Sequence, residues 1–230
     1  MTIKYHFFGK NCIIDRPLEK RAELNVALAK KDMKAQHVLF VNQIHGAEIV
    51  VVDSAEKIHG NQDLPKSDAL VTNLSNIVIG VITADCAPIL FCDEEKNVIA
   101  ATHAGWRGAK LGVIKSTIDA MKKLGAKNIK AMIGPMIAQK SYEISKEFFD
   151  DFVSEDSSNE IFFISGPKPD KYLFDLPSYI EKKLREAGIE KIENLKIDTY
   201  ENEKDFFSFR RSTHQKEKDC GRNVSAIMMK

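Results

Sequence analysis

Cys86 and His103 are the residues of this chain whose types and spacing most clearly indicate chemistry. Apolar residues follow Cys86 and precede His103, and a charged segment lies between them. If Asp93–Lys96 is the turn of an antiparallel hairpin, Cys86 lies directly opposite His103. Opposed residues share one face of a sheet, with Cβ atoms about 4.5–5.5 Å apart. We therefore expect the thiol and the imidazole to meet, although a shift of one residue would place them on opposite faces.

A thiolate beside an imidazole suits two kinds of chemistry. The pair can bind one zinc ion, or the cysteine can act as a nucleophile that a histidine base activates. A buried structural cysteine near a strand-end histidine would show the same pattern. Pro88 predicts an edge strand or a strand start at this point. Gly105 and Gly108 surround a tryptophan and an arginine and would let the backbone approach a ligand closely.

His45 is a candidate for a third ligand. It lies in a short segment that we expect to form a turn between strands over residues 37–41 and 48–52. A turn histidine can also be merely solvated, and spacing alone does not prefer His45 over His37 or His59. Three protein ligands with a fourth position left open are typical of a catalytic zinc. Such a zinc would supply an activated water or a Lewis acid.

Composition argues against several classes of protein. The 230 residues suit one domain spanning 1–230, and 43% hydrophobic residues suffice for a large core. A formal net charge of +1 gives no electrostatic footprint for nucleic acid or a membrane surface. The longest apolar stretches are too short to span a bilayer, and the N-terminus does not resemble a signal peptide. We expect a soluble, cytoplasmic protein.

The four cysteines do not form CxxC pairs. In a cytosolic chain this spacing argues against a disulfide framework and against a closed structural zinc site. Any metal would need mixed ligands.

Strands and helices alternate along the chain. Apolar runs predict strands over residues 3–8, 37–41, 48–52, 68–72, 77–84, 129–133, 195–198 and 225–229. Capping residues and helical periodicity predict helices over residues 15–31, 109–124, 145–153 and 175–187. Residues 53–67 are expected to form a long loop. The predicted fold is α/β to α+β, a layered sandwich of mixed β-sheets covered by helices.

Two further segments are candidates for substrate binding. Arg107 precedes the helix expected over residues 109–124, whose free N–H groups would favour an anion such as phosphate. Aromatic and cationic residues alternate over 205–211, which is typical either of a half-buried edge strand or of a surface that stacks on a nucleobase. The residues concerned are Phe206, Phe209, Arg210 and Arg211. Asp85 could orient a ligand or take a proton, although an aspartate at a strand end more often caps a loop.

Seven motifs together resemble the laccase-domain family, whose members are also described as purine nucleoside phosphorylases and peptidoglycan-editing factors. They are QIHG (43–46), SDALVT (67–72), TADCAPIL (83–90), HAGWRG (103–108), IGP (133–135), YEI (142–144) and FFSFRR (206–211). The resemblance runs from about residue 38 to the C-terminus. It implies a zinc ion bound by His45, Cys86 and His103. It also implies phosphorolysis of adenosine, inosine and S-methyl-5'-thioadenosine, with adenosine deamination as a further activity.

The sequence departs from the family pattern in two places. The segment before Asp15 is short, and residues 136–141 lack the cysteine that often precedes YE in the family. If these segments shape the substrate pocket, substrate preference could differ. The three proposed zinc ligands are unaffected.

The resemblance assigns roles, and it leaves alternatives open. We expect Cys86, His103 and Arg107 to act in catalysis, with Arg107 and the residues of the 206–211 segment binding nucleoside and phosphate. Copper is less favoured than zinc, because a multicopper site needs more imidazoles than six histidines without an HxH pair supply. The alternatives are a metal-free hydrolase with Cys86 as nucleophile, or a non-catalytic protein that binds nucleotides or acts in peptidoglycan quality control. A homodimer is left open.

Overall fold

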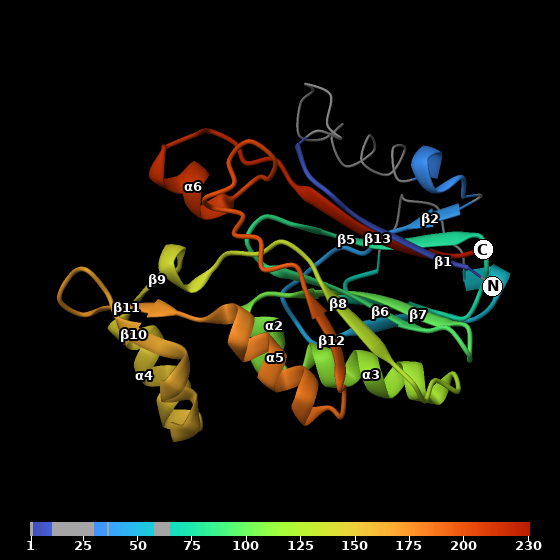
Figure 1. Cartoon of the computed structure of the whole chain (residues 1–230), viewed down its shortest axis with the longest axis horizontal. Coiled ribbons are helices and arrows are strands. Elements are labelled where there is room, and N and C mark those ends of the chain that lie inside the picture. The colour runs from blue at the N-terminus through green and yellow to red at the C-terminus, as the bar shows by residue number, and fades with distance from the viewer. Residues whose placement is uncertain (1, 11–29, 36, 58–64) are drawn as a thin grey trace.

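Two stacked β-sheets and a layer of helices make up the fold. The computed structural model describes residues 2–10, 30–35, 37–57 and 65–230 (Figure 1). In Figure 1 a four-stranded sheet lies above a six-stranded sheet, and helices cover the lower face of the latter. The predicted layered sandwich of mixed sheets with external helices is confirmed.

The four-stranded sheet carries both ends of the chain. Its strand order is β1 (Ile3–Phe8), β13 (Asn223–Met229), β5 (Ile77–Thr83) and β2 (His37–Leu39). β13 is antiparallel to both of its neighbours, whereas β2 runs parallel to β5. β13 and most of β5 are buried, and both strands are rich in apolar residues.

The six-stranded sheet contains His103 and the strand next to Cys86. Its order is β12 (Lys191–Asn194), β8 (Lys130–Ile133), β6 (Ala87–Asp93), β7 (Val98–Ala104), β4 (Ala69–Thr72) and β3 (Ile49–Val52). The two outer pairs are parallel, and the inner strands are antiparallel. All residues of β6 and β7 are buried, which makes this hairpin the centre of the sheet.

Apolar residues on both faces of the six-stranded sheet hold the layers together. The residues between the sheets include Leu39, Ile79, Leu90 and Ile99. A larger core joins the other face of the six-stranded sheet to α3 (Val113–Lys123) and α5 (Leu176–Glu186). Burying this much apolar surface is the dominant favourable contribution to folding.

A small lobe extends from the helical side. A three-stranded sheet in the order β10 (Phe163–Ser165), β11 (Lys171–Phe174) and β9 (Glu143–Ser145) packs with α4 (Lys146–Glu155) (Figure 1). Aromatic rings join this lobe to α5, since Phe152 lies 5.1 Å from Phe174 and 5.4 Å from Tyr179, centroid to centroid. Short 3-10 helices complete the described chain at Ala55–Lys57, Gln139–Ser141 and Ser157–Phe162.

Several predicted elements form as expected. The cap residues Ser145 and Asp175 accept hydrogen bonds from Phe148 N and Ser178 N, at the starts of α4 and α5. Gly125 and Gly188 follow helix ends with φ of 97° and 86°. The helix predicted over residues 15–31 lies largely outside the described residues, and so does much of the loop predicted over 53–67.

Other predicted elements are wrong. The helix predicted over 109–124 is two helices, α2 (Trp106–Leu111) and α3, because Gly112 adopts φ 95° and interrupts the turn. The strand predicted over 195–198 lies earlier, at β12. Residues 205–211 are not an edge strand, because Ser208 caps the helix α6 (Phe209–His214) there. His45 lies between β2 and β3, as predicted, and these two strands belong to different sheets.

Within the described residues, none of the helices is both long and apolar enough to cross a bilayer.

Candidate metal centre

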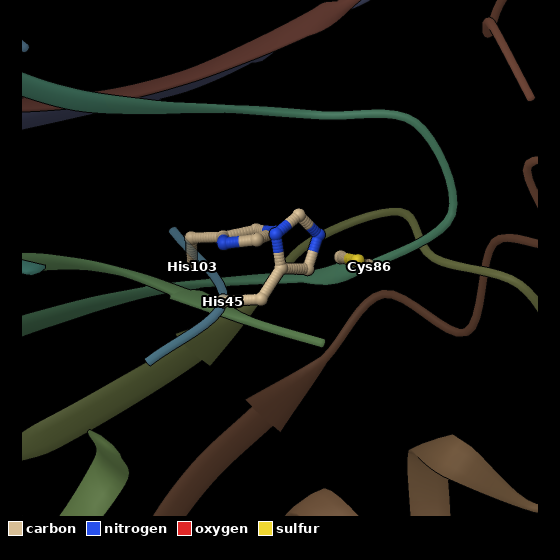
Figure 2. A group of neighbouring side chains, drawn as sticks. All are labelled: His45, Cys86 and His103. Atoms are coloured by element: carbon tan, nitrogen blue, oxygen red, sulfur yellow. The ribbon is translucent and has the colours of Figure 1, made fainter. Parts of the chain in front are cut away.

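Three side chains from separate segments converge at one end of the sheets. The ligand atoms of His45, Cys86 and His103 all lie within 4.8 Å of one another. Figure 2 shows the two imidazoles and the sulfur side by side. The histidine rings lie edge to face, and their centroids are 4.7 Å apart. His103 is buried, Cys86 is half-buried and His45 is exposed. The cluster therefore has one side that a small molecule can reach.

His103 is the last residue but one of β7 and is oriented by Asp68. Its Nδ1 lies 2.8 Å from Asp68 Oδ1, and its backbone N–H donates to the Asp68 carbonyl. Since the ionised carboxylate only accepts, Nδ1 carries the proton and Nε2 is left to face the cluster. A carboxylate behind a histidine in this way is typical of metal-binding imidazoles.

Asp68 also shapes the turn that carries His45. Its carboxylate accepts hydrogen bonds from three consecutive backbone N–H groups, those of Ile44, His45 and Gly46. His45 itself has φ 57°, a conformation that is uncommon outside glycine and that these bonds stabilise. One buried carboxylate thus positions two of the three candidate ligands.

Gln43 fastens the same turn to the other sheet. Its side-chain amide donates to the carbonyl of Ile82 and accepts from the N–H of Ile82, each at 2.8 Å. The amide replaces a backbone partner at the end of β5. The His45 turn is therefore fixed on both sides.

The hairpin register predicted from the sequence is wrong. Pro88, and not Cys86, pairs with His103, because the turn between β6 and β7 begins only after Asp93. Pro88 is the second residue of β6, which confirms a strand start but not an edge strand. Cys86 still reaches His103, because it lies in the bend before β6, where the backbone leaves the sheet.

Two glycines near His103 leave room for other parts of the chain to pack close to the cluster. A Cβ on Gly105 would lie 2.8 Å from Cys86 Sγ and 3.5 Å from His45 Cδ2. A Cβ on Gly108 would lie 3.0 Å from the carbonyl oxygen of Gly46. Both glycines therefore permit the start of α2 to pack closely against the residues that carry the ligands.

The electrostatics of the cluster favour a thiolate beside a charged imidazole. Burial alone would raise the pKa of Cys86, but the charge of His103 and hydrogen bonds from both histidines lower it to about 6. Burial alone would lower the pKa of His103, but Cys86 and Asp68 raise it to about 9. Burial also opposes ionisation of Asp68, and its bonds to His103 and to the turn outweigh this and lower its pKa. The deprotonated sulfur is the form that binds metals.

Tyr142 and Arg210 lie beside the cluster. Burial, together with the charge of Cys86, raises the pKa of Tyr142, so that its phenol stays protonated. The guanidinium carbon of Arg210 lies 5.3 Å from the centre of the Tyr142 ring, and Nη1 donates to the carbonyl of Glu143.

The other residues of the aromatic and cationic segment differ in their surroundings. Arg211 is buried and donates to the carbonyls of Thr199, Tyr200 and Phe206, so its guanidinium is occupied within the chain. Phe209 is 58% exposed on α6, and Phe206 is half-buried. Arg107 is exposed in the first turn of α2.

Asp68 is the functional residue that the sequence analysis did not single out. It lies inside a recognised motif, but an aspartate before a strand is usually a turn or cap residue. The signal that could have found it is the adjacent pair Ser67 and Asp68 directly before three apolar strand residues, since buried polar residues are uncommon there.

Comparisons with known proteins give relatives for almost the whole chain. Residues 13–230 match the model of the family described as multi-copper polyphenol oxidoreductase laccase. A purine nucleoside phosphorylase of Rickettsia conorii is 42% identical over 238 residues, which cover 100% of this chain and 97% of the relative. A purine nucleoside phosphorylase of Escherichia coli is 33% identical over 192 residues, covering 83% of this chain and 73% of the relative.

Solved structures share the fold. A hypothetical protein of Bacillus licheniformis, YfiH, superposes with a TM-score of 0.85 at 25% identity, covering 99% of this chain and 93% of that one. A Neisseria meningitidis protein gives a TM-score of 0.77 at 30% identity, with coverage of 96% and 85%.

Proposed function

Because this chain belongs to the multi-copper polyphenol oxidoreductase laccase family, in which the relatives named above are called purine nucleoside phosphorylases, we propose that it is a zinc-dependent purine nucleoside phosphorylase. The observation that carries the proposal is the convergence of His45, Cys86 and His103, with Asp68 behind His103. The proposed substrates are adenosine, inosine and S-methyl-5'-thioadenosine together with phosphate, and adenosine deamination is a proposed side activity. A cytoplasmic location belongs to the same proposal.

The donor set fits zinc. Two imidazoles and one thiolate with an accessible side match a catalytic zinc site, which keeps one position open. A zinc ion held there would supply a Lewis acid and an activated water. Among the described residues, this cluster is the one group of histidine, cysteine and acidic side chains with metal-binding geometry, whereas a multicopper oxidase needs several copper sites.

The neighbouring side chains supply the remaining functions. Asp68 holds the Nδ1 proton of His103 and so fixes the direction in which the ring presents Nε2. Arg107 and Arg210 would hold phosphate and offset developing negative charge. Phe206 or Phe209 would stack on the purine. We do not assign Arg211 to the substrate, because backbone carbonyls already occupy its guanidinium.

The decisive experiment follows products and metal together. Protein purified without added metal is analysed for zinc and copper, and then incubated with each nucleoside with and without phosphate. We expect about one zinc per chain, base and ribose 1-phosphate in the presence of phosphate, and inosine from adenosine without it. In Cys86→Ala we expect loss of zinc and of all products. Cys92→Ala is the matched control, since Cys92 is buried in the same strand region but outside the cluster.

A metal-free hydrolase is a second candidate. The chain Asp68–His103–Cys86 has the order of carboxylate, base and nucleophile, and the pKa of Cys86 is lowered to about 6. The hydrolase hypothesis would be favoured if the protein were active without stoichiometric metal and alkylation of Cys86 abolished that activity. If the wild type released no product from any purine nucleoside, and Cys86→Ala behaved identically, a binding protein would remain.

A further inference from the structure

Asp85 has an unusual backbone conformation directly before the ligand Cys86. Its φ is 91°, in the left-handed region that side chains other than glycine rarely adopt. It lies in the three-residue bend over 84–86, which joins the end of β5 in one sheet to the start of β6 in the other. The direction of this bend decides where the Cys86 sulfur points.

Three distant segments hold Asp85 in this conformation. Its Oδ1 accepts from the Thr199 hydroxyl, and its Oδ2 accepts from the backbone N–H of Arg210, both at 2.7 Å. Its carbonyl accepts from the N–H of Ile137 at 3.0 Å. Thr199 is fully buried, so its hydroxyl depends on this carboxylate as a partner.

We propose that Asp85 is a positioning residue, which directs the Cys86 sulfur toward His45 and His103 by fixing the bend before it. Glycine would adopt the same φ without strain, so conformation alone does not explain an aspartate here. The carboxylate adds what glycine lacks, namely two bonds that anchor the bend. The inference rests on the proposed metal centre and not on the identity of the substrate.

The same bonds couple the metal centre to α6. Asp85 contacts the backbone of Arg210, whose side chain lies over Tyr142. A group proposed to bind phosphate is therefore tied to a metal ligand through one residue. Loss of the Asp85 carboxylate should disturb the position of Cys86 and the start of α6 together.

Cobalt binding tests the positioning role without relying on catalysis. The metal-free protein is titrated with Co²⁺, and the thiolate-to-cobalt charge-transfer absorption reports ligation by Cys86. In Asp85→Gly, which relieves the backbone strain but removes both bonds, we expect affinity to fall by about tenfold or more, as for other residues that support metal ligands. Thr199→Val should show a smaller loss, and Thr199→Ser should bind as the wild type does.

A second readout needs no metal. The rate at which iodoacetamide alkylates Cys86 in metal-free protein should rise several-fold in Asp85→Gly and in Thr199→Val, because the bend is then free to open. This arm tests Asp85 even if the wild type binds no cobalt, an outcome that would count against the proposed function alone.

Asp198→Asn is the matched control. Asp198 also ties loops together, through Ala138, Ser141 and Tyr200, but does not contact the bend. We expect lower thermal stability in this variant with unchanged cobalt binding and alkylation. The inference is overturned if Asp85→Gly and Thr199→Val match the wild type in both readouts, or if Asp198→Asn shows the same losses.

Discussion

At the scale of single residues, Asp68 shapes the site through its carboxylate, and Gly105 shapes it through the absence of a Cβ. Asp68 forms hydrogen bonds with both the His45 turn and the His103 ring, which fixes the positions of these two candidate ligands relative to each other. Gly105 leaves room for Cys86 at the same point. Both residues act on position, and neither is expected to bind the metal.

Gly105→Ala should remove the metal without unfolding the protein. The new Cβ would lie 2.8 Å from Cys86 Sγ, which forces the short cysteine side chain to move. The backbone at Gly105, with φ −72° and ψ 170°, is accessible to alanine, so the fold itself should tolerate the change. We expect metal affinity to fall by about tenfold or more, measured by chelator competition.

Gly188→Ala provides the opposite control. Gly188 has φ 86°, and a Cβ added there would meet no atom within 4 Å, so alanine is strained at this position but touches nothing near the site. The strain should cost about 1–2 kcal/mol and lower Tm by a few degrees, with metal affinity unchanged. Equal metal affinity in Gly105→Ala and the wild type would contradict the steric argument.

At the scale of elements, local sequence signals predicted the ends of helices better than the pairing of strands. The caps at Ser145 and Asp175 and the glycine stop at 188 were predicted correctly, because each depends on a few neighbouring residues. The Cys86–His103 pairing was misjudged, since the four residues at 94–97 form the turn and one shift moves the whole register. The contact survived because Cys86 lies outside the strand.

Other parts of the site could not be predicted from local patterns. The bonds of Asp68 join segments more than 20 residues apart, and those of the Asp85 carboxylate join segments more than 100 residues apart. Such contacts follow from the packing of two sheets and carry no periodic signal. The capped helix at α6 was missed because alternating aromatic residues over 205–211 also fit a strand.

Asp93 should make the β6–β7 turn sensitive to acid. Its buried carboxylate accepts from the N–H groups of Glu95, Lys96, Lys127 and Asn128. Burial opposes ionisation, but these four bonds outweigh it and lower the pKa of Asp93 below its usual value. A carboxyl group with a lowered pKa stabilises the fold above about pH 4, and this contribution is lost as pH falls through the pKa of the folded state.

Asp93→Asn should therefore destabilise the protein at neutral pH more than in acid. The amide can replace only part of the acceptor capacity, so we expect a loss of about 1–3 kcal/mol at pH 7 and a Tm lower by several degrees. The difference from the wild type should shrink as pH falls toward 3, measured by thermal melts across pH. Asp119→Asn, which breaks only an exposed pair with Lys115, should change Tm little. A constant difference between Asp93→Asn and the wild type across pH would contradict the assignment.

At the scale of the whole molecule, the candidate metal centre joins the two sheets. His45 follows β2 of the four-stranded sheet and precedes β3 of the other, and Cys86 lies between β5 and β6, which also belong to different sheets. His103 belongs to the six-stranded sheet alone. A bound ion would thus link the two segments that connect one sheet to the other, β2 to β3 and β5 to β6, near one end of the sandwich (Figure 1).

Removal of the metal should therefore lower the stability of the whole chain and not only of the site. A ligand that binds only the folded state, present at a thousandfold excess over its Kd, adds about 4 kcal/mol, which for a chain of this size corresponds to a Tm shift of about 10 °C. We expect calorimetry to show one cooperative transition, in line with a single domain over 1–230, which chelator moves down by this amount and added zinc restores. In Cys86→Ala the transition should respond to neither, because a ligand is missing. A wild-type Tm that ignores zinc and chelator, or a Cys86→Ala variant that responds as the wild type does, would show that the three converging side chains do not hold a metal between the sheets.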